Sequence, residues 1–257
     1  MSPPDSLVVR AVGWLWWSLL PIRKRLAVEA YRACFPERDP AELRRSVGEM
    51  VEGYLDLVRG ERCEFEGLEE LEGPGLVLCG HFGAWDLTLI SAGRVRPMTA
   101  FVKAPSNALA AWWIERQRRR GGVQLLPPRN SIRAAYRALE EGRFIAFIQD
   151  QRHNAGIEVP FFGRPARTSE AFAAMAWRTR APLYGVWQWR EGGRYRARVE
   201  RLGWGIPDDR EQAIHELTAR SQAWYEEKIR IRPHSWLWLH DRWKLPGPRA
   251  RQRGPSR

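Results

Sequence analysis

Short apolar runs and longer amphipathic stretches alternate along the middle of the chain. The apolar runs predict buried strands over residues 75–80, 98–102, 123–127 and 144–149. Between them, apolar positions repeat at helical spacing, which predicts helices over residues 85–94, 106–120 and 131–141. Strands that alternate with helices of about ten to fifteen residues predict an α/β domain, in which helices flank a central, mostly parallel or mixed sheet.

The same alternation continues toward the carboxyl end. A helix is expected over residues 168–178, with Thr168 as its capping residue, and a longer one over about residues 209–230. Between these helices, the runs "LYGVWQW" and "RYRARVE" flank Gly192–Gly193, which predicts an antiparallel hairpin. The tail, residues 246–257, is basic and rich in proline and glycine, a composition typical of disorder.

Residues 1–60 are expected to be a helical segment that precedes the α/β domain of residues 61–245. The helices should break within "CFPERDPAE", where Asp39 can cap a helix that has Pro40 at its first position. The longest uncharged run, residues 11–22, is shorter than the roughly 20 residues that a spanning helix needs. It also lacks the basic leader and the cleavage site of a signal peptide.

Tryptophans and basic residues follow each other closely in this first segment, "SLVVRAVGWLWWSLLPIRKRLAV". Three tryptophans precede Arg23, Lys24 and Arg25, a pattern typical of a helix that lies in the headgroup layer of an anionic membrane. The alternative is that this apolar stripe packs against the core of the protein itself. Residues 1–60 are therefore expected to associate with a membrane without crossing it.

Composition adds a preference for anionic partners. The chain has 257 residues, 42 of them basic and 30 acidic, with a net charge of +12 and 14 tryptophans. Such a balance favours nucleic acid, an acidic membrane surface or phosphorylated substrates. Only four of the basic residues are lysines, which suits phosphate binding by arginine but also fits a simple coding bias. The three cysteines lack C-x-x-C spacing, so a disulfide framework and a zinc site are not expected.

The stretch "LVLCGHFGAWDLTL" carries the clearest chemistry. His81 follows an expected strand, and Asp86 lies in the first turn of the next expected helix. On one continuous helix, residues five apart point about 140° away from each other, so the two side chains could meet only across a turn. Imidazole is the side-chain base that works near neutral pH, and a carboxylate on one ring nitrogen fixes its tautomer. The spacing predicts a dyad that removes a proton from a substrate hydroxyl.

Other interpretations of the same stretch remain open. Asp86 could cap the helix while His81 forms a structural hydrogen bond. Cys79 could act as a thiolate nucleophile, although burial in a strand raises the pKa of a thiol. A metal bound by His81 and Asp86 would need a third ligand, and His153 has no recognisable spacing for that role. Neither a metal nor an organic cofactor is expected.

Four blocks of the chain resemble the bacterial lipid A biosynthesis acyltransferases, which belong to the wider glycerolipid acyltransferase group with its H-x4-D/E motif. The blocks are "GHFGAWDL", "FVKAPSNALAAWWIERQRRRGG", "FIAFIQDQRHNAGIEVPFFGRPARTSEAFAAMA" and "PHSWLWLHDRWK". They occur in the family's order and span about residues 76–244. The last block alternates like a strand, which would place Trp236, Trp238 and His240 on one face.

The resemblance implies a membrane-associated enzyme that moves a fatty acyl chain from acyl carrier protein or acyl-coenzyme A to a hydroxyl of a lipid acceptor, such as a lipid A precursor. It implies His81 as the base, Asp86 as its orienting partner and no acyl-enzyme. It also implies a cytoplasmic location on the bacterial inner membrane, peripheral or shallowly anchored. The residues that it implies in substrate binding are Lys103, Asn107, Arg116, Arg119, Asp150, Gln151, Arg164 and Thr168.

The chain departs from the family pattern in two respects. Family members usually begin with a longer apolar anchor, and the common "GNWE" is "GAWD" here. Other functions compete with lipid A acylation: transfer to another glycolipid or to a lysophospholipid, or hydrolysis by the same dyad. A nucleic-acid-binding module is a further hypothesis from the charge. Because the arginines are spread along the chain and no recognised motif appears, no nucleic-acid partner is expected.

Overall fold

The computed structural model describes residues 6–102, 107–128 and 130–244. Its helices are α1 (Leu7–Ser18), α2 (Lys24–Cys34), α3 (Leu43–Arg59), α4 (Trp85–Val95), α5 (Ala108–Arg120), α6 (Ile132–Glu140), α7 (Ala171–Thr179) and α8 (Arg210–Ile231), with short 3-10 turns η1 (Pro40–Glu42), η2 (Leu68–Glu70) and η3 (Pro233–Ser235). Its strands are β1 (Glu64–Glu66), β2 (Leu76–Cys79), β3 (Met98–Phe101), β4 (Gln124–Leu126), β5 (Phe144–Ile148), β6 (Ile157–Phe161), β7 (Arg164–Thr168), β8 (Leu183–Glu191) and β9 (Arg194–Arg201).

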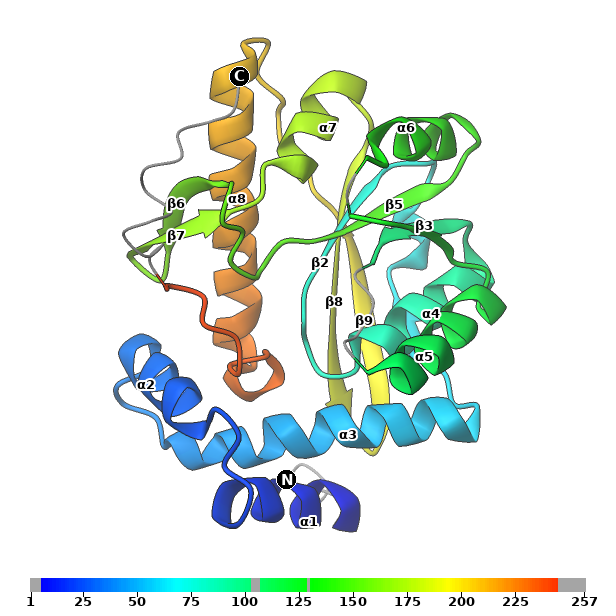
Figure 1. Cartoon of the computed structure of the whole chain (residues 1–257). Helices are drawn as coiled ribbons and strands as arrows, with labels where there is room; N and C mark the ends of the chain where they lie inside the picture. Colours follow the sequence, from blue (N-terminus) through cyan, green and yellow to red (C-terminus); the bar gives the residue numbers. More distant parts are fainter. Residues whose placement is uncertain (1–5, 103–106, 129, 245–257) are drawn as a thin grey trace.

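A seven-stranded sheet with helices on both faces confirms the expected α/β fold (Figure 1). The strand order is β1-β9-β8-β2-β5-β3-β4. Strands β8, β2, β5, β3 and β4 run parallel, whereas β8 and β9 form the antiparallel hairpin expected around Gly192–Gly193. The small antiparallel pair of β6 and β7 stands apart from this sheet.

Alternation along the strands divides the interior into two cores, because successive side chains of a strand point to opposite faces. Leu76 and Leu78 of β2 belong to the core that α7 and α8 cover. Val77 belongs to the other core, to which α3, α4 and α5 contribute Leu57, Leu87 and Ile114. Central strands that are buried on both faces have continuous apolar sequences, and for this reason the apolar runs predicted them.

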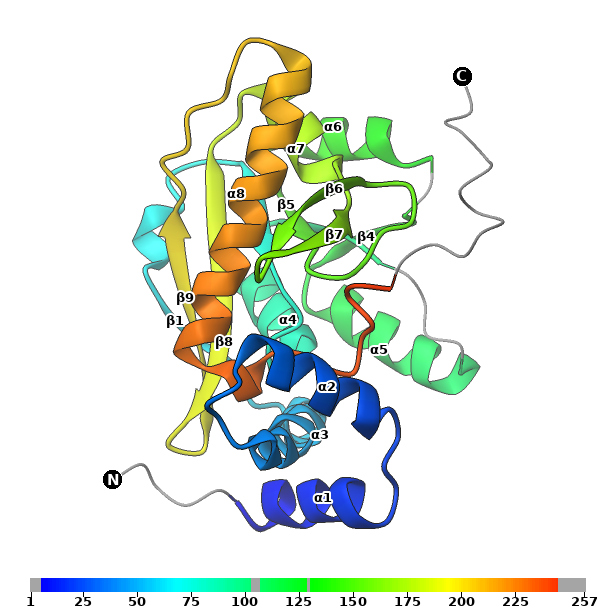
Figure 2. The same ribbon diagram turned by 90° about the vertical axis from the view of Figure 1, so that its left-hand side faces the viewer.

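Residues 6–60, the described part of the first segment, are largely helical, as expected, and they pack beneath the sheet (Figures 1 and 2). Asp39 accepts a hydrogen bond from the Ala41 backbone nitrogen at 2.9 Å, and Pro40 is the first residue of η1. Helix α1 lies along α3 at close range, since a side chain at Gly13 or Gly48 would collide with the backbone of the other helix. None of the described helices is long and apolar enough to cross a membrane.

Three local expectations differ from the structure. Thr168 ends strand β7 instead of capping a helix, and α7 begins three residues later. The segment 233–244 is a 3-10 turn followed by irregular chain, with one bridge from Trp236 to Phe82 in place of a strand. Strands β1, β6 and β7 were not expected. The predicted start of a helix at Ser106 and the tail 246–257 lie outside the described residues.

Candidate active site

His81 and Asp150 meet at the carboxyl end of the sheet. Strands β2 and β5 are parallel neighbours, with Cys79 opposite Ile148. His81 and Asp150 each lie two residues beyond those partners, so the register brings them to the same level. The imidazole Nδ1 lies 2.8 Å from Asp150 Oδ1, and the His81 backbone nitrogen donates to Asp150 Oδ2 at 2.8 Å. One carboxylate therefore fixes both the backbone and the ring of the histidine.

The tautomer of His81 follows from the ionisation of Asp150. Burial would raise the pKa of this fully buried carboxyl, but the charge of His81 and the hydrogen bonds from His81 and Trp236 outweigh it, and the pKa is lowered. An ionised carboxylate can only accept, so Nδ1 carries the proton in the neutral ring. Nε2 is left with a free lone pair. The histidine side chain is 19% exposed, which leaves it partly accessible.

Asp86 does not take the role that its spacing suggests. Its Oδ1 accepts from the Arg118 guanidinium, at 2.8 Å from Nε and 2.6 Å from Nη2, and its Oδ2 accepts from the Tyr54 hydroxyl at 3.1 Å. The expected His81–Asp86 hydrogen bond is thus corrected to a His81–Asp150 hydrogen bond. The physical reason is that Asp86 lies in the first turn of α4, where its carboxylate contacts Tyr54 of α3 and the mostly buried cation Arg118 of α5. Burial and the negative charge of Asp86 raise the pKa of Tyr54, which keeps that phenol protonated.

The turn that carries His81 is held by the segment after α8. The Leu237 nitrogen donates to the His81 carbonyl at 3.0 Å, and the Gly83 nitrogen donates to the Ser235 carbonyl at 2.7 Å. Gly83 has a positive φ of 44°, a conformation that glycine adopts without strain. Trp236 Nε1 donates to Asp150 Oδ2 at 2.8 Å. The closing segment therefore fixes the turn and the carboxylate together.

A large apolar cavity of about 1320 Å³ opens beside His81. Part of it runs along the sheet face toward α4 and α5, between Val77, Ala100 and Ala146 on the strands and Leu89 and Ile114 on the helices. Four of its polar lining residues, His81, Gln151, Arg152 and His153, follow the carboxyl ends of β2 and β5, and Arg118 and Ser169 also line it. Such a cavity suits a long hydrocarbon chain whose polar end lies at the histidine.

Two of the residues expected to bind substrate line this cavity or meet the histidine. Asp150 binds His81, and Gln151 lines the cavity. Asn107 caps α5, accepting from the Ala110 nitrogen at 2.9 Å. Lys103 lies outside the described residues.

The remaining predicted substrate residues lie elsewhere. Arg116 and Arg119 point outward from α5, and Arg119 pairs with Glu115 at 2.8 Å. Arg164 stacks on the Trp243 ring, 4.5 Å from its centroid. Thr168 is fully buried and accepts from Arg242 at 2.6 Å, so it supports the fold around the site.

Sequence reasoning left three groups at the site unassigned. Four arginines crowd the end of α5, Arg116, Arg118, Arg119 and Arg120. Among them Arg118 lines the cavity, because it follows Ile114 by four residues on the inner face of the helix. That spacing was readable in the sequence. Tyr54 on α3 and the indole nitrogen of Trp236 could not be assigned, because their contacts cross 32 and 86 residues of chain.

The thiol mechanism loses support from the geometry. Burial, with a smaller contribution from the Asp150 charge, raises the pKa of Cys79 to about 12. Its sulfur lies 3.4 Å from the Phe147 carbonyl oxygen of the neighbouring strand. Although Cys79 lines the cavity, a thiol with so high a pKa is rarely ionised near neutral pH, which disfavours it as a nucleophile.

The comparison with protein families agrees with the resemblance noted above. A family model described as "Bacterial lipid A biosynthesis acyltransferase" matches residues 8–245 of the chain. Among solved structures, the chain is similar to the 1-acyl-sn-glycerophosphate (LPA) acyltransferase PlsC from Thermotoga maritima, with 16% identity, a TM-score of 0.41 and coverage of 88% of this chain and 96% of that chain. No curated protein matches the chain. The family match includes every element that builds the cavity and the turn of His81.

Proposed function

The chain belongs to the bacterial lipid A biosynthesis acyltransferase family and is an acyltransferase of lipid metabolism, and we propose that it moves a fatty acyl chain from an acyl thioester to a hydroxyl group of a lipid. The donor is acyl carrier protein or acyl-coenzyme A, and the acceptor is a lipid A precursor, another glycolipid or a lysophospholipid. The observation that carries this proposal is the His81–Asp150 pair at the mouth of an apolar cavity.

The proposed reaction uses the free lone pair of His81. The acyl chain lies in the apolar cavity with its thioester carbonyl near the ring, and the lipid hydroxyl approaches Nε2. Nε2 takes the hydroxyl proton as the alcohol oxygen attacks the carbonyl carbon, and the imidazolium then returns this proton to the departing thiolate. Asp150 stabilises the imidazolium through Nδ1–H, as a carboxylate does in hydrolase triads. No bond between enzyme and acyl group is formed.

Arg118 and Asp86 have a supporting role in this proposal. The tetrahedral intermediate carries a negative oxygen, which needs a donor or a cation near it. Arg118 lines the cavity and is held by Asp86, so it is the described cation best fixed for this task. Asp86 thus acts through the arginine and not through the histidine.

The first sixty residues are proposed to bind the membrane that holds the lipid acceptor. Trp16 is buried, so part of the apolar stripe packs on the protein itself, whereas Trp14 is 54% exposed. Leu19, Leu20 and Ile22 are also exposed in the connection to α2. Exposed apolar side chains beside basic residues are typical of a protein that lies on an anionic bilayer. The proposed location is the cytoplasmic face of the bacterial inner membrane.

Transfer and hydrolysis use the same base and are separated by one experiment. Purified protein is incubated with an acyl thioester, with and without a lipid acceptor in mixed micelles, and thiol release is measured together with acylated lipid. A transferase releases thiol in proportion to the acylated lipid formed. Thiol release that ignores the acceptor would show a hydrolase and refute the proposal.

A further inference from the structure

Helix α5 has two faces of different character. Ala110, Trp113, Ile114 and Arg118 follow helical spacing and line the cavity. On the opposite face, Leu109 is 73% exposed and Trp112 is 59% exposed. A helix that separates a cavity from solvent usually carries polar residues on its outer face. The outer face of α5 begins instead with two large apolar side chains.

Basic residues follow these apolar ones along the same face. Trp112 lines a shallow hollow together with Glu115, Arg116, Arg119 and Arg120. The Arg116 guanidinium carbon lies 5.8 Å from the Trp112 ring centroid, and Glu115 pairs with Arg119. The hollow therefore has three cations against one anion, with an indole at its edge. An indole beside arginines is suited to the boundary between lipid chains and anionic headgroups.

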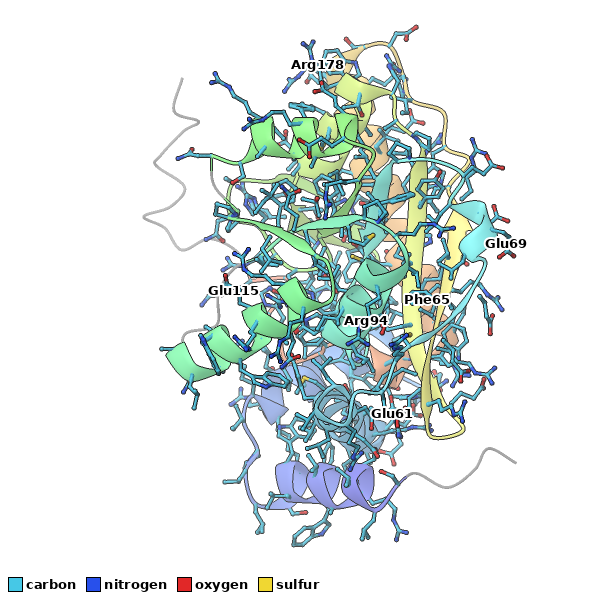
Figure 3. All side chains as sticks on the ribbon, turned by 90° about the vertical axis from the view of Figure 1, so that its right-hand side faces the viewer. Glu61, Phe65, Glu69, Arg94, Glu115 and Arg178 are labelled. Carbon is cyan, nitrogen blue, oxygen red and sulfur yellow. The ribbon has the colours of Figure 1, made fainter. Side chains whose placement is uncertain are left out.

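The position of α5 relates this face to the first sixty residues. In Figures 2 and 3, the first turn of α5 and the connection between α1 and α2 project from the same side of the molecule. That connection exposes Leu19, Leu20 and Ile22, and the exposed Arg23 and Arg25 follow it. Glu115, labelled in Figure 3, marks the part of α5 that follows the apolar turn. Two surfaces that are far apart in sequence thus expose apolar and basic side chains on the same side of the molecule.

We propose that the outer face of α5, defined as Leu109, Trp112, Arg116, Arg119 and Arg120, is a second membrane contact. Its occupant is an anionic bilayer, because apolar side chains enter lipid and the arginines after them meet its headgroups. Since the inner face of the same helix lines the cavity, this contact holds the cavity wall at the bilayer surface. A lipid hydroxyl then reaches His81 without leaving the membrane boundary. This consequence rests on the proposed function, whereas the contact itself does not.

The test measures vesicle binding by the full-length protein and needs no activity. Wild type and the double variant Leu109→Gln/Trp112→Gln are sedimented with phosphatidylcholine vesicles that contain about 30% phosphatidylglycerol. We expect the variant to bind about tenfold more weakly, which corresponds to about 1.4 kcal/mol of lost apolar burial. Glutamine keeps a good helix propensity, and circular dichroism checks that the fold is intact.

A matched control places the same changes on other surfaces. Val95 and Ile231 are exposed apolar residues at the ends of α4 and α8, and Val95→Gln/Ile231→Gln should bind within about twofold of wild type. Adding Trp14→Gln and Leu20→Gln to the α5 variant should weaken binding further, as expected for two separate contacts. Equal binding by wild type and the α5 variant would overturn the proposal. So would normal vesicle binding with lost affinity for an acidic acyl carrier protein, which would make the partner a protein.

Discussion

At the scale of single residues, the site depends on how a buried carboxylate is satisfied. Asp150 accepts from the backbone nitrogen and the ring of His81 and from the Trp236 indole, and it is fully buried. A buried charge is costly unless such donors surround it. These hydrogen bonds keep Asp150 ionised and thereby keep the proton of His81 on Nδ1.

Trp236→Phe should weaken this ionised state. The change removes one charge-assisted hydrogen bond, worth about 1.5–3 kcal/mol, from the ionised form of Asp150, so the lowered pKa of this carboxyl should rise toward its ordinary value. A carboxyl with a lowered pKa in the folded state stabilises the protein at higher pH, and this contribution is lost as the pH falls through the folded pKa. The variant should therefore begin to lose its Asp150 contribution at a higher pH, in urea unfolding measured from pH 7 to pH 3.

Trp238→Phe is the matched control for that change. Its indole is equally buried and donates to the neutral Pro233 carbonyl at 2.7 Å. This variant should lose stability by a similar amount at every pH. If both variants gave parallel stability curves, the Trp236 hydrogen bond would have no special bearing on Asp150.

The sequence singled out His81, the proposed base, but not its hydrogen-bond partner. His81 stands out because it follows a strand end within a glycine-rich turn. Asp150 was expected only among the substrate-binding residues, because its pairing with His81 depends on β5 lying next to β2, and strand order is not visible in a local pattern. Asp86 is the carboxylate nearer to His81 in sequence, but in the structure it forms an ion pair with Arg118. Sixty-nine residues separate the two groups that the structure joins.

At the scale of elements, the strands set the depth of the apolar cavity. Side chains on one face of a strand repeat about every 6.6–6.8 Å. Cys79 and Ile148 are opposite each other nearest the histidine, and Val77 and Ala146 form the next layer. Met98 lines the cavity one layer deeper, opposite Phe144. Alanines at positions 100 and 146 keep the second layer open.

Ala146→Leu should therefore shorten the acyl chain that the enzyme accepts. The larger side chain fills one layer, about 7 Å of cavity depth, and penalises long chains by the energy of a misfit in an apolar pocket. We expect kcat/KM for long-chain thioesters to fall about tenfold relative to short-chain ones. The short-chain donors are the internal control for folding. An unchanged order of donor preference would show that the acyl chain lies elsewhere.

Element prediction succeeded where the local pattern was strong and failed where prolines or tryptophans changed it. Strands β6 and β7 were missed because Pro160 and Pro165 interrupt their runs, and in the structure these prolines face each other across the pair. The segment 233–244 alternates like a strand, but it forms no strand. Trp236 and Trp238 are buried, and their ring nitrogens donate hydrogen bonds to Asp150 and to the Pro233 carbonyl. The alternation of polar and apolar residues in this segment therefore reflects the burial of its tryptophans and not pairing within a sheet.

At the scale of the whole molecule, the segment after α8 joins the first helices to the site. The Ser46 hydroxyl of α3 donates to the Trp236 carbonyl at 3.2 Å, and the same segment holds the His81 turn. His234 lies mostly buried within this junction. Burial, together with the charges of Arg45, Arg232 and Arg38, lowers its pKa to about 3.

This histidine should make global stability depend on pH. Its folded pKa lies below the ordinary value, so between about pH 6.5 and about pH 3 the unfolded chain binds a proton that the folded chain does not. Stability then falls as the pH falls, by up to about 1.4 kcal/mol per pH unit from this residue. Urea unfolding of His234→Gln should show a smaller loss than wild type across this window.

His215→Gln is the comparison, because His215 is exposed on α8. This variant should follow the wild-type curve. Parallel curves for wild type and His234→Gln would mean that His234 does not remain neutral in the folded protein.

A double-mutant cycle of acyl transfer is the most direct test of His81 and Asp150 as one unit. His81→Ala should lower kcat/KM by about 10²-fold or more, the usual scale of a general base. Adding Asp150→Asn to His81→Ala should cost nothing further, because groups that act as one unit are not additive. Adding Asp86→Asn to His81→Ala should lower kcat/KM by the same factor as Asp86→Asn does alone. Retained activity in His81→Ala, or factors for His81 and Asp150 that simply multiply, would contradict the account.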